Sequence, residues 1–369
     1  MKIYEYEKKD TDDFSLNFEG SFSSYKKNAS ADIAVFNLSF LSPYITGVKK
    51  NDTVSCRLFI NKRYTEIKAM SEFPAFSENH QKLNNCKAET DEIKKLFECL
   101  KDKTKLLIFI HGFSTNENKL CNYYKFIEKI VSENTSCLFL NLPFHLGRTP
   151  ENESSGRRLI NYDDKETLTF FHQSVVDIRK AIDIAEDLLS PTETNICGIS
   201  LGSMVSVITK AVDKRIKKAV LLLGGGCWEE IHWKGILRFV LRGNCADEGT
   251  INRSKCHKYY LNYFEFLDNF KKSEDKTISS DLSEDPLLSM LCSKKCYLCD
   301  PLTFAHMINP EEVIMINSNI DHFFTRKSSN LLWKELGKPK IYWLNYPHFS
   351  SILNNIRVFG IISEFLYSN

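Results

Sequence analysis

The sequence predicts an α/β fold with a mostly parallel, doubly wound sheet, and two observations carry this prediction. Continuous apolar runs, of which residues 106–110 are the clearest, are typical of strands that helices cover on both faces. Amphipathic segments separate these runs, and the longest, 164–189, has apolar or small residues three and four positions apart and stops before Pro191. Strands that alternate with helices form parallel sheets whose ligands bind beyond the carboxyl ends of the strands.

The alternation is regular from residue 105 onward, and the N-terminal part is less regular. Residues 1–31 are polar and lack a sustained periodicity, so we expect them to form a loosely packed arm. The expected strands are 33–40, 54–60, 106–110, 137–142, 195–197, 219–223, 313–316 and 341–344. The expected helices are 91–100, 116–133, 164–189, 204–212 and 328–336, the last of which ends before Gly337.

The chain of 369 residues is long enough to bury one large core that carries an insertion. We expect the polar arm at 1–31, the first part of the core at 32–226, the insertion at 227–300 and the second part of the core at 301–369.

Composition narrows the class of protein. Lysine plus arginine is 49 and aspartate plus glutamate is 47, so no strong field favours nucleic acid as a partner. The first ten residues contain no secretory signal, and no run approaches ~18 apolar residues, so we expect a soluble, cytoplasmic protein. Several of the 12 cysteines lie inside apolar segments, where cysteine behaves as a small hydrophobic residue, and we expect them to be reduced.

A Gly-x-Ser-x-Gly sequence, residues 198–202, lies between an expected strand and an expected helix. This arrangement describes a nucleophile elbow, in which Ser200 occupies a strained turn with its hydroxyl exposed above the sheet. Side chains two residues before and after the serine would collide as strand and helix close, so Gly198 and Gly202 have a steric function. An ordinary Ser/Gly turn is the alternative, and the residues downstream argue against it.

Two further candidates follow expected strands in the order Ser, Asp, His. Asp321 comes shortly after 313–316, and His348 comes shortly after 341–344. A serine hydroxyl needs a base to take its proton during attack, which is the role we expect of His348. A carboxylate on the far nitrogen of that imidazole fixes its tautomer, which is the role we expect of Asp321. Asp300 is an alternative acid and His322 an alternative base.

The same edge of the sheet offers donors for an oxyanion. Leu201 follows the nucleophile and can donate one backbone N–H, and the turn His111-Gly112-Phe113 can present a second N–H, from Phe113. The Phe113 side chain could also pack into an acyl pocket, and His111 could be a satisfied polar residue beneath the turn.

These residues resemble the motifs of the α/β-hydrolase superfamily. The match consists of His111-Gly112 after the third strand, the elbow at 198–202, Asp321 after the seventh strand and His348 after the eighth. The resemblance covers the chain from about residue 105 onward, apart from 227–300. It implies an eight-stranded sheet with helices on both faces, serine hydrolase chemistry, and an insertion after the sixth strand of the kind that commonly becomes a lid.

A looser resemblance concerns the loop after 137–142 and the long helix. Residues 142–145 with Arg148, and Gln173 with Asp177, look like esterase-like proteins near the alpha/beta-hydrolase-domain-18 group. His145 and Arg148 could contact a substrate carboxylate or head group, although a loop arginine is more often solvated.

The insertion at 227–300 is rich in aromatic residues, of which Trp228 and Phe264 are the ones we expect to line the substrate site. A lid with an apolar underside would favour an acyl or other hydrophobic substrate. The alternatives are a helical pair packed as core and an interfacial membrane contact.

Cys292, Cys296 and Cys299 form a C-x3-C-x2-C cluster, with Cys256 and His257 upstream. Four such ligands could hold a structural zinc, but the spacing is unfamiliar, and reduced, loosely packed cysteines are the preferred interpretation. We expect neither a metal nor a cofactor.

The sequence therefore favours a serine hydrolase that cleaves a carboxylic ester, with a small-molecule ester or acyl compound as substrate. A transient membrane or lipid contact through the lid is a further expectation. Thioesterase, peptidase and acyltransferase chemistry would use the same residues, and a non-catalytic binding protein on the same fold is the alternative from another class.

Overall fold

A computed structural model of the chain describes residues 3–8, 13–22, 33–61, 88–131, 134–160, 164–241, 252–272, 294–347 and 350–367. Its centre is a mixed sheet of nine strands in the order β1-β2-β3-β5-β4-β6-β7-β8-β9. The strands are β1 (Phe14–Phe22), β2 (Ile33–Leu41), β3 (Thr53–Asn61), β4 (Lys105–Ile110), β5 (Thr135–Leu140), β6 (Glu193–Ile199), β7 (Ile216–Leu222), β8 (Val313–Ser318) and β9 (Lys340–Leu344).

The sheet is antiparallel at one end and parallel over the rest. Antiparallel pairs join β1 to β2, β2 to β3 and β3 to β5. Parallel pairs join β5 to β4, β4 to β6, β6 to β7, β7 to β8 and β8 to β9. The parallel part confirms the predicted fold class, because every strand expected there from an apolar run is present with small shifts in its bounds. The carboxyl ends of β4 to β9 therefore share one edge, which we call the carboxyl edge.

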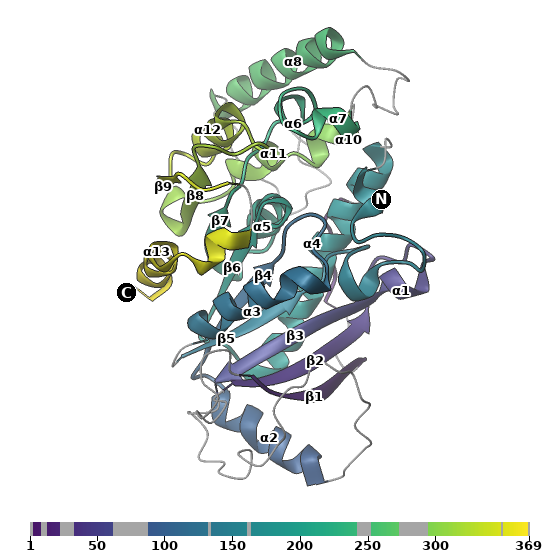
Figure 1. The fold of residues 1–369 in the computed structure, drawn as a ribbon, viewed down its shortest axis with the longest axis vertical. Coiled ribbons are helices and arrows are strands. Elements are labelled where there is room, and N and C mark those ends of the chain that lie inside the picture. Colours follow the sequence, from purple (N-terminus) through teal and green to yellow (C-terminus); the bar gives the residue numbers. More distant parts are fainter. Residues whose placement is uncertain are drawn as a thin grey trace.

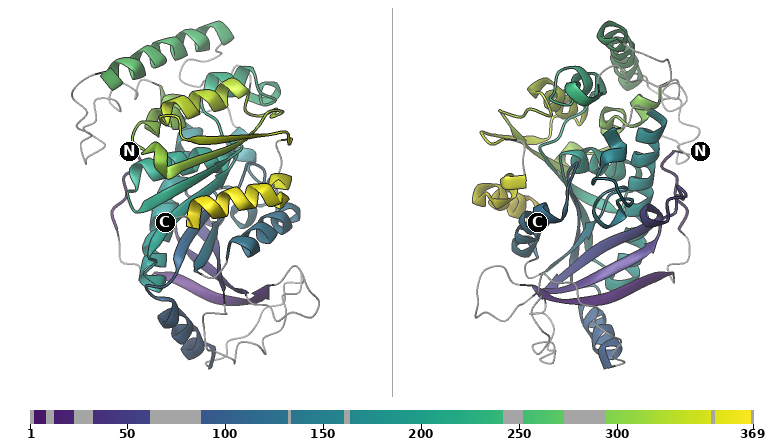
Figure 2. Two further views of the ribbon diagram at one scale, coloured as in Figure 1. Left: turned by 90° about the vertical axis from the view of Figure 1, so that its left-hand side faces the viewer. Right: turned by 45° about the vertical axis from the view of Figure 1, so that its right-hand side comes forward.

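Helices cover both faces of the sheet. The helices and helical turns are α1 (Lys49–Asp52), α2 (Ala88–Leu100), α3 (Glu117–Ile130), η3 (Leu146–Arg148), η4 (Arg157–Ile160), α4 (Asp164–Leu189), α5 (Leu201–Val212), α6 (Trp228–Trp233), α7 (Arg238–Leu241), α8 (Arg253–Lys272), α10 (Lys295–Leu298), α11 (Pro301–Ala305), η5 (Pro310–Glu312), α12 (Arg326–Glu335), η6 (Ser350–Asn354) and α13 (Ile356–Tyr367). Figures 1 and 2 show α3 and α13 on one side of the sheet and α4 and α5 on the other.

Two apolar cores result from this layering. In β4, Leu106, Ile108 and Ile110 pack into the core shared with α2, α4, α5 and α12, whereas Leu107 and Phe109 pack into the core shared with α3 and α13. Successive side chains of a strand point to opposite faces, so one continuous apolar run supplies both cores.

The N-terminal region differs from the expected loosely packed arm. Residues 14–22 form β1, which pairs with β2 and adds a ninth strand to the expected eight. Tyr4 is buried; its backbone N–H donates to His172 Nδ1 at 3.0 Å and its hydroxyl donates to the Leu298 carbonyl at 2.8 Å. The alternation of Phe14, Leu16 and Phe18 was present in the sequence, but an irregularity between Phe18 and Gly20 interrupts it.

The described parts of the segment 227–300 form α6, α7, α8 and α10. In Figure 1, α8 lies at the top of the molecule, beyond α6, α11 and α12. The inward residues of α8, Tyr260 and Tyr263, pack on Tyr297 with ring centroids 5.5 and 4.7 Å apart. No helix in the described part of the chain is long and apolar enough to cross a lipid bilayer.

Candidate active site

Ser200 lies at the turn between β6 and α5 with backbone angles φ 56° and ψ −116°. A positive φ is unfavourable for a residue with a side chain, so the surrounding structure must impose it. The Ser200 N–H donates to the Leu222 carbonyl at 2.8 Å, and the Ser200 carbonyl accepts from the N–H of Ser203 at 2.9 Å and from its hydroxyl at 2.6 Å. Hydrogen bonds thus hold the peptide groups before and after Ser200 in place.

The two glycines of the elbow have the steric function that their spacing predicts. A Cβ at Gly198 would lie 2.2 Å from the Gly202 carbonyl oxygen and 2.4 Å from Ser206 Oγ. A Cβ at Gly202 would lie 2.3 Å from the Ile110 oxygen and 2.6 Å from the His111 oxygen. Both contacts are far shorter than real Cβ contacts, so only glycine lets β4, β6 and α5 approach each other here.

The oxyanion turn, residues 111–115, packs directly against the nucleophile. A Cβ at Gly112 would be 3.4 Å from Ser200 Cβ. Leu201 is the first residue of α5, where a backbone N–H has no partner within the helix and lies at the positive end of its dipole. Within the described residues, no acceptor takes a hydrogen bond from the N–H of Leu201 or of Phe113.

Buried side chains hold the oxyanion turn from behind. His111 Nδ1 lies 2.8 Å from the Gly112 carbonyl and therefore donates, while His111 Nε2 accepts from the Leu142 N–H at 3.1 Å. Burial lowers the pKa of His111 to about 3, so the ring is neutral, with its proton on Nδ1. Thr115 Oγ1 donates to the Gly112 carbonyl at 2.8 Å, and the Gly112 N–H donates to the Tyr123 hydroxyl at 3.3 Å. His111 thus is the satisfied polar residue beneath the turn.

Asp321 lies three residues beyond the end of β8 in the acid loop, residues 319–325. Its Oδ1 accepts the N–H groups of Phe323 at 2.7 Å and Phe324 at 2.9 Å, which orient the half-buried carboxylate. The loop after β9 lies beside this loop, because the Asn319 N–H donates to the Leu344 carbonyl at 2.8 Å and Ser318 Oγ donates to the Tyr346 carbonyl. His348 lies outside the described residues, and its role as base stays a prediction.

The alternative acid, Asp300, has a structural function. Its buried carboxylate accepts the backbone N–H groups of Cys227, Leu302 and Trp228 and the Tyr260 hydroxyl, at 2.9 to 3.1 Å. These contacts join the beginning of the insertion to its end. The alternative base, His322, is exposed, and its carbonyl accepts the Ile236 N–H at 2.7 Å.

Arg148 is neither solvated nor exposed to a substrate, because its side chain is fully buried. Its Nη1 lies 2.8 Å from Asp177 Oδ2 and 3.0 Å from the Asn141 carbonyl, and its Nε donates to the Asn51 carbonyl at 2.8 Å. Burial raises the pKa of Asp177, and the Arg148 guanidinium opposes that rise. We therefore leave Arg148 out of the proposed substrate site.

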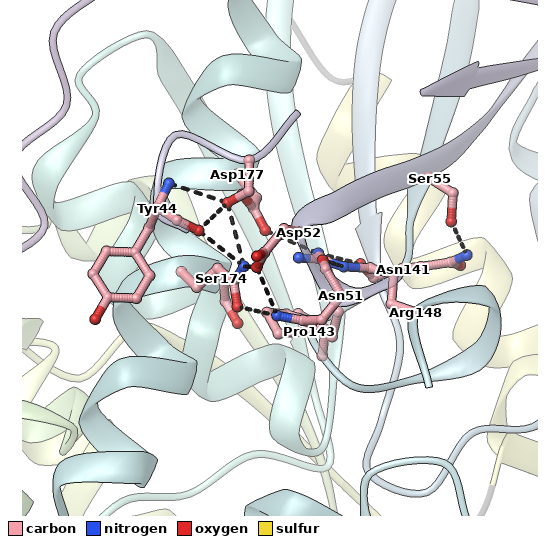
Figure 3. A network of polar contacts seen from close by, with 12 residues as sticks. Tyr44, Asn51, Asp52, Ser55, Asn141, Pro143, Arg148, Ser174 and Asp177 are labelled. Carbon is pink, nitrogen blue, oxygen red and sulfur yellow. Dashed lines mark hydrogen bonds and ion pairs between the residues drawn. The ribbon is translucent and has the colours of Figure 1, made fainter. Parts of the chain in front are cut away.

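The ion pair is the centre of a buried polar cluster that we call the Arg148 network, shown in Figure 3. Asn51 Nδ2 donates to Gln173 Oε1 at 2.8 Å, and Asn51 Oδ1 accepts the Phe144 N–H at 2.8 Å. Ser42 Oγ donates to Asp177 Oδ1 at 2.6 Å. The network joins the β2–β3 connection, the loop after β5 and helix α4. The sequence signal for it was the pair Gln173 and Asp177 on the buried face of α4.

His145 packs behind the oxyanion turn. Its Nδ1 donates to the Pro143 carbonyl at 2.8 Å, and its ring centroid is 5.2 Å from that of His111 and 6.1 Å from that of Phe113. Its Nε2 faces Gly156, where a Cβ would lie 2.4 Å away. Burial lowers the pKa of His145 to about 4. The ring is closed off by protein atoms, so we also leave His145 out of the substrate site.

Trp228 and Phe264 lie in the insertion at different places. Trp228 is buried at the start of α6, with its ring 6.0 Å from that of Phe171 on α4. Phe264 is half-buried on α8 beside Tyr263, with ring centroids 5.5 Å apart. Their role in substrate binding stays a prediction.

The cysteine cluster is described only in part. Cys296 and Cys299 are not in disulfide bonds, and Cys292 lies outside the described residues. No group of three or more possible metal ligands occurs in the described ranges.

Comparison of the sequence with protein-family models and with curated proteins gives no match. Solved structures similar to this chain include a cold-adapted esterase from an Arctic intertidal metagenomic library, with 14% identity, a TM-score of 0.48, and coverage of 93% of this chain and 98% of that one. Acetyl xylan esterase 1 from Thermoanaerobacterium has 14% identity, a TM-score of 0.47, and coverage of 96% and 88%. Acylaminoacyl peptidase from Pyrococcus horikoshii has 11% identity, a TM-score of 0.47, and coverage of 88% and 41%.

Because these similarities are low, the identification of the fold rests on the chain itself. A mostly parallel sheet with helices on both faces and an elbow serine after β6 is what the α/β-hydrolase resemblance implied. The chain therefore has the α/β-hydrolase fold.

Proposed function

We propose that this protein is a serine hydrolase that cleaves a carboxylic ester through an acyl-serine intermediate. The observation that carries the proposal is the backbone of Ser200, held at φ 56° between β6 and α5 with the oxyanion turn against it. Strain of this kind persists where the surrounding structure enforces it, and it places the hydroxyl above the sheet.

In the proposed reaction, Ser200 Oγ attacks the ester carbonyl carbon and its proton passes to the imidazole of His348. The N–H groups of Leu201 and Phe113 donate to the oxyanion that forms. The C–O bond to the alcohol then breaks, and the alcohol leaves with the proton from His348. Water attacks the acyl-serine by the same route in reverse, which releases the carboxylic acid and restores Ser200. Asp321 orients His348 and stabilises its charged form.

The proposed substrate is an ester with a hydrophobic acyl group, and the segment 227–300 is the proposed lid. Supporting this, α6 and the residues after it lie against the acid loop, because the Ile236 N–H donates to the His322 carbonyl and a Cβ at Gly235 would be 2.3 Å from the Phe323 oxygen. Trp228 and Phe264 stay candidates for its apolar lining.

The test is labelling with a fluorophosphonate probe, which needs no knowledge of the substrate. We expect Ser200 of the wild-type protein to displace fluoride from the probe, so that the protein gains the mass of one probe less HF, and we expect Ser200→Ala to gain none. Labelling of the Ser200→Ala variant at the wild-type rate would overturn the nucleophile assignment. A wild-type protein that is folded yet neither labelled nor active on any ester would instead favour a binding protein.

A further inference from the structure

We propose that an exposed apolar and cationic rim beside the acid loop docks this protein on membranes that contain anionic phospholipids. The rim consists of Ile236, Arg238, Phe239, Ile320, Arg326 and Tyr346. The inference rests on the proposed function for its purpose, which is to bring a lipid ester to Ser200 at the carboxyl edge. Its test does not depend on turnover.

The apolar side chains of the rim are exposed to solvent. Phe239 is 65% exposed, Ile320 49%, Ile236 45% and Tyr346 40%. Single exposed apolar side chains are ordinary on protein surfaces, and only a group of them indicates an interaction site. The four side chains therefore indicate an interaction site only if they lie together.

Hydrogen bonds show that the three segments carrying these residues are neighbours. The Ile236 N–H donates to the His322 carbonyl at 2.7 Å, which joins the residues after α6 to the acid loop, and Phe239 is one helical turn further along. Ser318 Oγ accepts the Ile320 N–H at 3.1 Å and donates to the Tyr346 carbonyl, which joins the acid loop to the loop after β9. The apolar residues thus follow one another along a continuous rim.

The charge of the rim identifies the partner. Arg238 is exposed and lies over the Phe239 ring at 4.6 Å, and Arg326 is exposed and lies over the Trp343 ring at 4.6 Å. In residues 234–241, 319–330 and 343–347 the sole carboxylate is Asp321, whose Oδ1 accepts two backbone N–H groups. A surface that combines apolar side chains with arginine and lacks exposed acid is complementary to anionic lipid head groups above an acyl layer.

The rim lies at the same edge of the sheet as Ser200. The rim flanks the ends of β8 and β9, and Ser200 follows the end of β6 at the same edge of the sheet. A membrane that contacts the rim would face the edge that carries the nucleophile, so an ester could pass from the lipid layer to Ser200 without crossing bulk water.

The experiment measures binding of the Ser200→Ala protein to vesicles of phosphatidylcholine with or without phosphatidylglycerol, by co-sedimentation. We expect binding to the anionic vesicles that weakens as salt rises. Adding Phe239→Ser should weaken it by about tenfold through loss of apolar contact. Adding Arg238→Gln should weaken it by about fivefold and only for anionic vesicles.

Ile356 and Arg357 provide the matched control. They are an adjacent exposed apolar and cationic pair, with Ile356 82% exposed, at the start of α13 on the face of the sheet covered by α3. Figure 1 shows α13 well apart from α7. Ile356→Ser and Arg357→Gln should leave binding unchanged.

The proposal is overturned if the protein does not bind anionic vesicles, or if the α13 variants weaken binding as much as the α7 variants. Turnover of a soluble short-chain ester by proteins with Ser200 intact tests the proposed function separately. Phe239→Ser and Arg238→Gln should leave that turnover at the wild-type level, so loss of docking and loss of catalysis are distinguishable.

Discussion

The oxyanion turn lies between two regions that are built in opposite ways. On one side is the elbow, where backbone atoms of β4, β6 and α5 approach each other because residues 198 and 202 have no side chain. On the other side is the Arg148 network, where large polar side chains fill the space between the β2–β3 connection and α4. The elbow is specified within five residues of sequence, whereas the network depends on partners such as Ser42 and Asp177, 135 residues apart.

This difference teaches what each region contributes. In the proposed reaction the elbow sets the position of the attacking oxygen, so its failure should abolish turnover while most of the fold persists. The network supports the loop that braces the oxyanion turn, so its failure should first appear as lost stability.

The largest effect is expected at the reacting groups. Ser200→Ala and Asp321→Ala should each lower kcat/KM by roughly 10⁴-fold or more, and the double variant should be little worse than Ser200→Ala, because the residues act as a unit. The measurement is turnover of an activated short-chain ester, with thermal unfolding as a check that all three variants remain folded. If the fold losses in kcat/KM of the two single variants multiply in the double variant, Asp321 and Ser200 do not act as a unit.

The Arg148 network should yield the largest effect on stability. Arg148→Met leaves the buried Asp177 carboxylate without its cation, and we expect a loss of about 3 to 5 kcal/mol in the free energy of unfolding. The double variant Arg148→Met, Asp177→Leu should recover much of this loss, because it removes both charges.

A half-exposed pair, Arg158 and Glu153 at 2.8 Å, is the matched control for this network. Arg158→Met should cost less than about 1 kcal/mol, since water screens that pair. Equal losses at the two arginines, measured by urea unfolding, would contradict the structural role of the buried pair.

The elbow should also respond to a single added methyl group. Gly202→Ala places a Cβ 2.3 Å from the Ile110 oxygen, so strand and helix must separate, at a cost of about 1 to 3 kcal/mol. Gly360 in α13 is the control, because a Cβ there meets no atom within 4 Å. Gly360→Ala should stabilise the protein by up to about 1 kcal/mol through helix propensity alone. A Gly202→Ala protein as stable as wild type would reject the steric argument.

Lowering the pH should destabilise the protein through the two histidines behind the oxyanion turn, His111 and His145. The pKa of His111 is lowered to about 3 and that of His145 to about 4, so the folded state keeps both rings neutral. Below pH about 6.5 the unfolded chain binds these protons and the folded state does not, so stability is lost as pH falls toward 4.

Each buried histidine should contribute a slope of about 1.4 kcal/mol per pH unit in that window. His145→Phe keeps an aromatic ring among His111, Phe113 and Phe170. Because the variant lacks one of the two titrating rings, the slope should fall by about 1.4 kcal/mol per pH unit. The measurement is urea unfolding at a series of pH values, and an unchanged slope in His145→Phe would show that His145 is charged in the folded state.

The sequence predicted the parallel strands, the elbow and the steric need for Gly198 and Gly202, because each of these follows from neighbouring residues. It did not predict the burial of Arg148, since a loop arginine is usually solvated and its partners are distant in sequence. Gln173 and Asp177, four residues apart on an apolar helix face, were the available signal, because buried polar side chains require partners. The strand β1 was missed because the irregularity at Gly20 interrupts its alternation.

The smallest effect is expected in the insertion at 227–300, a third region besides the elbow and the Arg148 network. Phe264 lies on α8 beside Tyr260 and Tyr263, whose hydroxyls bond to Asp300 Oδ2 and Thr303 Oγ1 at 2.9 Å. If the insertion is a lid, Phe264→Ala should change the ratio of kcat/KM for long-chain and short-chain esters by about fivefold, which corresponds to roughly 1 kcal/mol of acyl contact. Tyr263→Phe removes only the bond to Thr303 and serves as the control for packing. A Phe264→Ala protein that loses stability and keeps its chain-length ratio would show that α8 is a packing element, and the hydrophobic-substrate proposal would then depend on the rim alone.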